Sequence, residues 1–213
     1  MTEQLTAASL VLGLRALAAS DIRLAQLLQQ VGEPPLWARD PGFPTLVHIM
    51  LEQQVSLASA RAVFRRLIAL VGPLTPQRFL ETEVARLREI GFSWQKAAYC
   101  RGLAEAMAAG RFPLDRLEVM EDREARNMLL TIKGIGPWTA DIYLLMALRR
   151  PDIWPSGDLA LATAVQHLYG LSARPDPGAL DAMGEPWRPW RAVAARLLWH
   201  YYLSNRAAPL LLD

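Results

Sequence analysis

Two glycines, Gly134 and Gly136, are of a residue type and at a spacing that could form an anion-binding site. They stand two apart in the segment Lys-Gly-Ile-Gly-Pro-Trp-Thr. Glycine tolerates the positive φ angles of a tight reversal and leaves backbone N–H groups uncovered by a side chain. Such N–H groups beside a helix N-terminus can hold a phosphate oxygen, because the helix dipole is positive there. A plain turn between two helices explains the same glycines, so both interpretations stay open at this point.

The segments that flank these glycines are predicted to be helices. An apolar helical run over residues 121–132 precedes them. Pro137 then suits the first turn of a helix over residues 138–149, because the missing N–H of proline is not needed there. Residues 129–141 are therefore expected to be the end of one helix, a tight hairpin and the start of another.

Helical periodicity continues along nearly the whole chain, and no convincing strand alternation is visible. Cap-like residues precede several of the expected helices; among them are Ser56, Thr75, Ser93 and Asp158. Proline-rich segments at residues 33–42, 150–157 and 174–178 are expected to be loops. The sequence thus predicts an all-α fold of roughly ten helices, the last of which opens at residues 187–190 and ends near residue 205.

Composition limits the kinds of site that the chain can build. Its 213 residues are 52% hydrophobic, which is enough for one large domain or two lobes around a cleft. The single cysteine, Cys100, excludes an internal disulfide and a cysteine-ligated metal cluster. A net charge of +2 permits a nucleic-acid partner without demanding one. The N-terminus has no basic signal segment or membrane span, and we expect a cytoplasmic protein that does not bind membranes.

The hairpin and a downstream aspartate together form a more specific pattern. Asp158 follows Trp138 after 20 residues, within the sequence Pro-Ser-Gly-Asp. Residues 51–56 read Leu-Glu-Gln-Gln-Val-Ser, and residues 187–191 read Trp-Arg-Pro-Trp-Arg. From about residue 42 to residue 202 the chain resembles the helix-hairpin-helix/Gly-Pro-Asp superfamily of DNA glycosylases, and most closely the 3-methyladenine DNA glycosylase II group.

This resemblance implies a fold and a domain organisation. We expect two helical lobes around a cleft, which form a single core over residues 1–213 and carry the helix-hairpin-helix motif at residues 129–141. Several bacterial members have an additional N-terminal β domain. The N-terminus here is short and helical in pattern, so that domain is expected to be absent.

The resemblance assigns catalysis to Asp158. Hydrolysis of an N-glycosidic bond builds positive charge on the deoxyribose, and a carboxylate below the sugar can stabilise that charge and orient or deprotonate a water molecule. On general grounds an aspartate at this position caps the following helix, and the two roles are compatible. Asp141 and Asp152 are weaker rivals for the catalytic role.

Trp138 occupies the position at which bifunctional relatives carry a Schiff-base lysine. An indole cannot form that adduct, and Lys133 matches a non-catalytic position. The resemblance therefore implies base removal without strand cleavage. The lack of a cysteine set also argues against the iron–sulfur branches of the superfamily.

Tryptophans match the base pocket of the resembling group, at Trp138 and Trp199. Alkylation at N3 or N7 leaves a purine cationic, and stacking it on indole contributes about 0.5–2 kcal/mol. Ile142 and Leu159 stand where that group has tyrosines, so this pocket is expected to be less aromatic. For Trp187 and Trp190, core packing is the favoured interpretation, and they are not assigned to the pocket. For Trp199, core packing and a place in the pocket both stay open.

The resemblance also predicts how DNA is held. Backbone amides of Gly134, Gly136 and Thr139 would bind a phosphate, with Lys133 nearby, and carbonyls of Leu130, Ile132 and Ile135 would hold a structural Na⁺ or K⁺. No other cofactor is expected. Gln54 matches the residue that fills the stack when the damaged base flips out. The alternative for Gln54 is a polar helix-end residue that bonds to nearby backbone.

The resemblance therefore implies a monofunctional glycosylase of base excision repair, which removes alkylated purines of the 3-methyladenine and 7-methylguanine type from damaged duplex DNA and leaves an abasic site. We expect a monomer of bacterial type, associated with the nucleoid. One alternative is a non-catalytic hairpin module, as found in polymerases and ligases. Another is a glycosylase for a different lesion, such as uracil or a mismatch.

Overall fold

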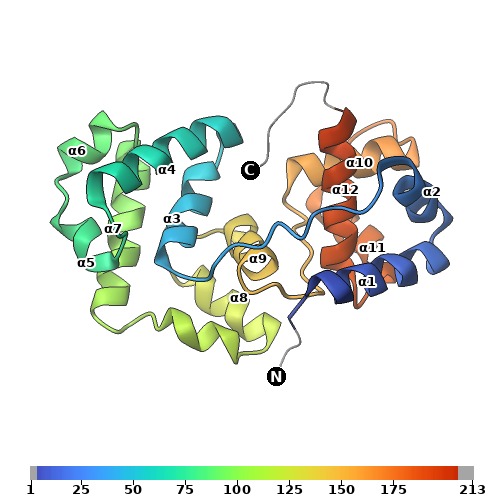
Figure 1. The fold of residues 1–213 in the computed structure, drawn as a ribbon, viewed down its shortest axis with the longest axis horizontal. Coiled ribbons are helices and arrows are strands. Elements are labelled where there is room, and N and C mark those ends of the chain that lie inside the picture. The colour runs from blue at the N-terminus through green and yellow to red at the C-terminus, as the bar shows by residue number, and fades with distance from the viewer. Residues whose placement is uncertain (1–3, 206–213) are drawn as a thin grey trace. The chain divides into compact units, whose positions relative to one another are not determined.

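The computed structural model describes residues 4–205, and these form helices and loops without a β-strand, which confirms the all-α prediction (Figure 1). The described residues contain twelve α-helices where the sequence predicted roughly ten. None of these helices has the length and apolarity needed to cross a membrane. The α-helices are α1 (Ala7–Ser20), α2 (Ile22–Val31), α3 (Phe43–Glu52), α4 (Leu57–Val71), α5 (Pro76–Glu81), α6 (Val84–Glu89), α7 (Trp94–Ala108), α8 (Asp122–Leu130), α9 (Pro137–Met146), α10 (Leu159–Tyr169), α11 (Pro177–Gly184) and α12 (Arg191–Asn205), with short 3₁₀ helices η1 (Leu114–Glu118) and η2 (Glu185–Trp187).

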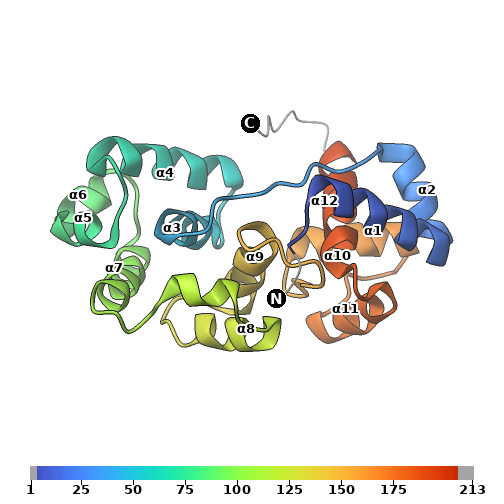
Figure 2. The same cartoon turned by 60° about the horizontal axis from the view of Figure 1, so that its bottom comes forward.

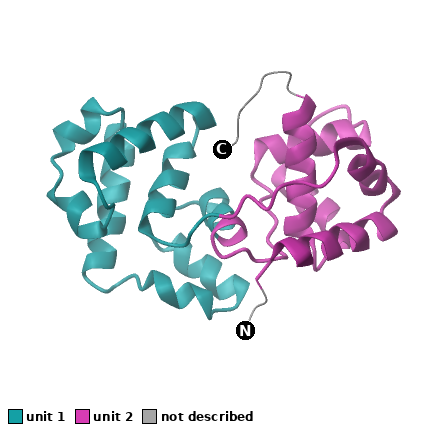
Figure 3. Ribbon diagram, in the orientation of Figure 1, with its two compact units in different colours: residues 1, 39–143 teal, residues 2–38, 144–213 magenta. Residues whose placement is uncertain are grey.

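The chain divides into two compact units, which Figure 3 colours separately. Unit 1 comprises residues 39–143 of the described chain, with α3 to α8 and most of α9. Helix α7 is its centre, since α3, α5 and α6 all pack against it (Figures 1 and 2). Phe79 anchors this core and makes ring contacts with Phe43 and Phe92.

Unit 2 comprises described residues 4–38 and 144–205, so the N-terminal helices pack with the C-terminal ones. Helix α12 is its centre and contacts α1, α2 and α10. Eight consecutive residues of α12, from Ala192 to Trp199, are buried, because neighbouring segments cover it on every side. The backbone N–H of Leu5 donates to the carbonyl of Arg149 at 2.7 Å and joins the two parts of the unit.

Helix starts agree with the capping residues that the sequence predicted. In each case a side-chain oxygen accepts a backbone N–H from the first turn and so satisfies a donor that the helix itself leaves unpaired. The pairs are Ser56 with Ser59 at 3.2 Å, Thr75 with Arg78 at 3.3 Å, Ser93 with Lys96 at 3.1 Å and Asp158 with Leu161 at 2.8 Å.

Three helix boundaries differ from the predictions. The last helix begins at Arg191 rather than at residue 187, because Pro189 disfavours helical backbone at Arg188, whose ψ is 143°. The second arm of the hairpin ends at Met146 rather than near residue 149, and Arg149 adopts a φ of +53°. The first arm ends at Leu130, two residues before its predicted end.

Candidate functional site

The glycine-rich hairpin between α8 and α9 is a tight turn in unit 1. The N–H of Ile135 donates to the carbonyl of Ile132 at 3.0 Å and closes the turn. Gly134 adopts a φ of +94°, and a Cβ there would lie 2.4 Å from the ring of Tyr99. Gly134 is therefore required both by its backbone angle and by the aromatic ring that packs on it.

Both glycines permit positive φ, but of the two only Gly134 adopts it. Gly136 is absent from the positive-φ residues of the described chain, and a Cβ there would meet open space. Its carbonyl accepts the N–H of Ala140 at 3.0 Å, so it is already the first residue to bond into α9. The turn therefore does not require a glycine at position 136. The close approach of a ligand is the one reason that remains for a glycine there.

The start of α9 presents the backbone donors that the sequence assigned to a phosphate. Pro137 is the first residue of α9, and Thr139 is the third. N–H groups in the first turn have no acceptor within their own helix, and the dipole is positive there. Thr139 is 1% exposed, and Lys133 is exposed in the turn itself. This end of the helix therefore has the chemistry of an anion site.

Gln53 joins this hairpin to the end of α3. Its side-chain amide Nε2 donates to the carbonyl of Gly134 at 2.9 Å and to the hydroxyl of Thr139 at 2.7 Å. The two residues that receive these bonds are both among the predicted phosphate-binding positions. The loop after α3 and the hairpin are thus held together by one side chain, a contact that the sequence did not predict.

Gln54 follows immediately and is exposed at the surface of unit 1. Its φ is +57°, a backbone conformation that is uncommon for a residue with a side chain. Lys96 lies beneath this loop, and its ammonium donates to the carbonyl of Leu51 at 2.6 Å and to that of Gln53 at 2.8 Å. Burial lowers the pKa of Lys96. Its ammonium is therefore engaged by backbone carbonyls.

The carbonyls of Leu130, Ile132 and Ile135 lie where α8 ends and the turn begins. Leu130 is the last residue of α8. Three neutral carbonyls without a carboxylate suit a monovalent cation better than a divalent one. The negative end of the helix dipole adds to that preference. The carbonyl of Ile132 accepts the N–H of Ile135, and a carbonyl oxygen has a second lone pair for an ion. Residues 4–205 contain no cluster of His, Cys, Asp or Glu suited to a metal ion.

Asp158 is held from two directions in unit 2. Its Oδ1 accepts the backbone N–H of Leu161 at 2.8 Å, which caps α10, and also the indole N–H of Trp199 at 3.1 Å. Trp199 is 7% exposed and comes from the middle of α12. The capping role of Asp158 is confirmed, and the bond from Trp199 brings together two predicted site residues that lie 41 positions apart.

The rival carboxylates are engaged in ion pairs. Asp141 is 4% exposed, and Arg126 contacts both of its oxygens at 2.6 and 3.2 Å, which ties α8 to α9. Asp152 contacts Arg188 at 2.5 Å and Arg191 at 2.9 Å. These ion pairs give both aspartates a structural role.

The predicted aromatic residues have different environments. Trp138 is half-buried on α9 of unit 1, and Trp199 is in unit 2 with Asp158. Of the two positions that replace tyrosines, Ile142 is buried, whereas Leu159 is 69% exposed. Trp187 packs in the core of unit 2, edge-on to Trp154, and donates to Asp21 at 3.1 Å, as core packing predicts. Trp190 packs against Gly13, where a Cβ would approach its ring to 2.8 Å.

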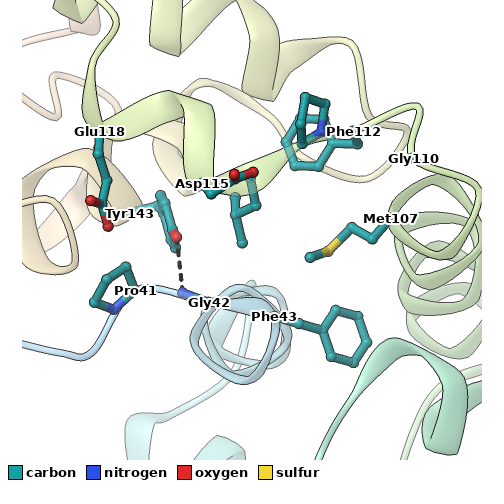
Figure 4. A pocket seen from close by; sticks show the side chains of 11 residues that line it. Pro41, Gly42, Phe43, Met107, Gly110, Phe112, Asp115, Glu118 and Tyr143 are labelled. Carbon is teal, nitrogen blue, oxygen red and sulfur yellow. Dashed lines mark hydrogen bonds between the residues drawn. The ribbon is translucent and has the colours of Figure 1, made fainter.

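Unit 1 also contains a cavity of about 510 Å³, which none of the predicted site residues lines (Figure 4). Its walls are mainly apolar and come from the start of α3, the end of α7, η1 and α9. The hydroxyl of Tyr143 accepts the N–H of Gly42 there at 3.0 Å, and burial raises the pKa of this tyrosine to about 12. This hydrogen bond fixes the start of α3 against α9.

Comparisons with known proteins indicate one family. A family model described as "HhH-GPD superfamily base excision DNA repair protein" matches residues 47–189. The structure of 3-methyladenine DNA glycosylase Mag1 from Schizosaccharomyces pombe, in complex with abasic DNA, is similar with a TM-score of 0.83 and 27% identity over 88% of this chain and 94% of that one. A DNA-3-methyladenine glycosidase from Bacillus halodurans gives a TM-score of 0.75 and 31% identity over 89% and 88%. A DNA-3-methyladenine glycosylase of Bacillus subtilis is 27% identical over 81% of this chain, and the match spans 59% of that relative.

Proposed function

We propose that this chain, which belongs to the HhH-GPD superfamily of base excision DNA repair proteins, is a monofunctional DNA glycosylase that hydrolyses the N-glycosidic bond of alkylated purines in duplex DNA. The observation that carries the proposal is the fixed carboxylate of Asp158, which the N–H groups of Leu161 and Trp199 hold on one oxygen. The names of the similar proteins, which act on 3-methyladenine, support the choice of substrate.

Asp158 acts through its negative charge. As the bond between C1′ and the base nitrogen breaks, its electron pair leaves with the base and positive charge develops on the deoxyribose. A carboxylate fixed nearby stabilises that charge without having to reorganise. It also orients a water molecule and accepts its proton as the water oxygen bonds to C1′. The products are the free base and an abasic site.

A cationic purine reduces the demand for a general acid. Methylation at N3 or N7 places positive charge on the ring, so the base departs as a neutral molecule. We assign Trp138 and Trp199 to base recognition, because indole faces attract a cationic ring. Leu159 is exposed where the resembling group has a tyrosine, so we expect a more permissive pocket.

The hairpin holds the DNA backbone. Amides of Gly134, Gly136 and Thr139 are assigned to a phosphate, and Lys133 adds charge beside them. The carbonyls of Leu130, Ile132 and Ile135 would hold a Na⁺ or K⁺, which would supply further positive charge next to that phosphate. No other cofactor enters the reaction. Gln54 fills the space that the flipped nucleotide leaves.

Strand cleavage by a Schiff base needs a lysine, and this chain has two. The ammonium of Lys96 is engaged by the carbonyls of Leu51 and Gln53, and Lys133 lies in the turn of the hairpin, at a position that is not catalytic in the resembling group. Trp138 has no amine. These three residues support the proposal that the protein has no lyase activity. We further propose that the protein acts as a monomer on the DNA of the bacterial nucleoid, in the cytoplasm.

The decisive experiment compares two aspartates on damaged DNA. Asp158→Asn should lower release of 3-methyladenine by at least about a hundredfold while binding to abasic-site DNA persists. Asp152→Asn is the matched control, because Asp152 is engaged by Arg188 and Arg191, and its rate should stay near that of the wild type. Base release by Asp158→Asn at the wild-type rate would refute the catalytic assignment. Trapping of an enzyme–DNA adduct with borohydride would refute the monofunctional mechanism.

A further inference from the structure

We infer that Lys96 and Gln53 are positioning residues that hold Gln54 ready to enter the DNA stack and that couple it to the phosphate-binding hairpin. The inference rests on the proposed function, since it concerns how that same site flips a base. It is carried by four hydrogen bonds within unit 1 and by the backbone conformation of Gln54.

Gln54 is exposed and has a φ of +57°. This conformation is uncommon for a residue with a Cβ, and such residues concentrate at functional positions. A residue that must enter the stack cannot be held by contacts on its own side chain. The restraint therefore has to act on the backbone beside it.

Lys96 supplies that restraint. Its ammonium donates to the carbonyls of Leu51 and Gln53, which lie at the C-terminal end of α3. A cation is favourable there because the last carbonyls of a helix carry partial negative charge. The Gln53 carbonyl and the Gln54 N–H belong to one planar peptide group, so fixing that oxygen orients the backbone of Gln54. The lowered pKa of Lys96 reflects the partial burial of this contact.

Gln53 extends the restraint to the hairpin. Its amide donates to Gly134 and Thr139, at 2.9 and 2.7 Å, and both of these residues are assigned to the phosphate. One side chain therefore links the segment assigned to the backbone of the damaged strand with the segment assigned to fill the stack. A phosphate held by the hairpin fixes the position at which Gln54 enters.

Positioning predicts an effect that depends on whether the lesion is stacked. In Lys96→Met, single-turnover release of a methylated purine should slow about tenfold when the lesion is fully paired. When the lesion lies opposite an abasic site, flipping is easier and the loss should be at most about twofold. Lys96→Arg, which can still donate to both carbonyls, should recover most of the paired rate. Gln53→Met should give the same ratio of paired to unpaired rates as Lys96→Met.

Arg101 offers a matched control on the same helix. Its Nη1 donates to the carbonyls of Leu80 and Thr82 at 3.2 and 3.1 Å, away from Gln54 in the sequence. Arg101→Met removes a comparable bond, and the ratio of paired to unpaired rates should stay at its wild-type value. Circular dichroism and thermal melting establish that each variant is folded.

A double variant completes the test. Gln54→Ala should reproduce the paired defect, and adding Lys96→Met to it should slow release no further. Equal loss on paired and unpaired lesions, or additive losses in the double variant, would overturn the positioning role while the wild-type enzyme stays active. Absence of base release by the wild-type protein would instead refute the proposed function.

Discussion

The indole N–H of Trp199 donates to Oδ1 of Asp158 across 3.1 Å, and the same oxygen accepts the backbone N–H of Leu161 at 2.8 Å. One residue comes from the middle of α12 and the other from the loop before α10. Because these two helices pack against one another within unit 2, the carboxylate is oriented by the fold itself. Trp199 is therefore assigned two roles, as a ring that faces the base and as a donor that fixes the carboxylate.

Replacing the donor while keeping an aromatic ring separates these roles. Trp199→Phe removes the N–H, and we expect the single-turnover rate of base release to fall about tenfold, which corresponds to the loss of one hydrogen bond to a charged group. Binding to abasic-site DNA should be unchanged. Trp190→Phe is the matched control, because Trp190 packs against Gly13, and it should alter stability only. An unchanged rate of base release in Trp199→Phe would contradict the role of its N–H and leave the ring with a packing role only.

The two hairpin glycines should respond differently to alanine. In Gly134→Ala the new Cβ would lie 2.4 Å from the ring of Tyr99 at a φ of +94°, so we expect a loss of about 2 kcal/mol or more in the free energy of unfolding. In Gly136→Ala the Cβ enters open space, and stability should change by less than about 0.5 kcal/mol. Urea denaturation measures both.

DNA binding gives the second readout for these glycines. Gly136→Ala should weaken binding to abasic-site DNA while leaving the fold intact, because a methyl group covers backbone that a phosphate approaches. Weak binding by Gly134→Ala would follow from distortion of the turn. Wild-type affinity in Gly136→Ala would remove Gly136 from the phosphate site.

The sequence predicted the local features of the fold because they depend on neighbouring residues. Caps such as Ser56 and Asp158 act within one helical turn, so their pattern is visible in the sequence. Contacts over long separations left no such signal. Gln53 with Thr139 and Lys96 with Leu51 depend on how helices pack, and the packing of the N-terminal helices against α12 is of the same kind.

The difference between the two hairpin glycines has a related cause. Two glycines in a hairpin both permit positive φ, but only the position at which the chain reverses requires it. Tyr99, whose ring packs on Gly134, comes from α7 and lies 35 residues away in the sequence. The pair Gly134 and Tyr99 could be predicted only from the packing of α7 against the hairpin.

Cys100 should be unreactive in the folded protein. It is fully buried in α7, and burial raises the pKa of its thiol to about 12. The thiolate is the reactive form, so a disulfide reagent at pH 8 should not modify the native protein and should label one thiol after denaturation. Rapid labelling of the native protein would indicate that α7 opens locally.

Asp21 should contribute more stability than an ordinary helix cap. Its Oδ1 accepts the N–H groups of Arg23 and Leu24, and its Oδ2 accepts the indole N–H of Trp187 at 3.1 Å and the hydroxyl of Tyr169 at 3.0 Å. Asp21→Ala should therefore lower the free energy of unfolding by about 2–3 kcal/mol. Asp176→Ala, which removes an exposed cap from α11, should lower it by about 1 kcal/mol.

The difference between these two variants should depend on pH. Burial alone would raise the pKa of Asp21, but the hydrogen bonds from Trp187 and Tyr169, with those from the backbone, bring it below 3.8. Between the folded pKa and the unfolded value of 3.8, the unfolded chain binds more protons, so stability rises with pH there. The contribution of Asp21 is thus complete above about pH 5 and is lost as the pH falls through its folded pKa. Urea denaturation of wild type, Asp21→Ala and Asp176→Ala between pH 2 and 7 measures this. A gap between the two variants that is the same at every pH would contradict a role for the charged carboxylate.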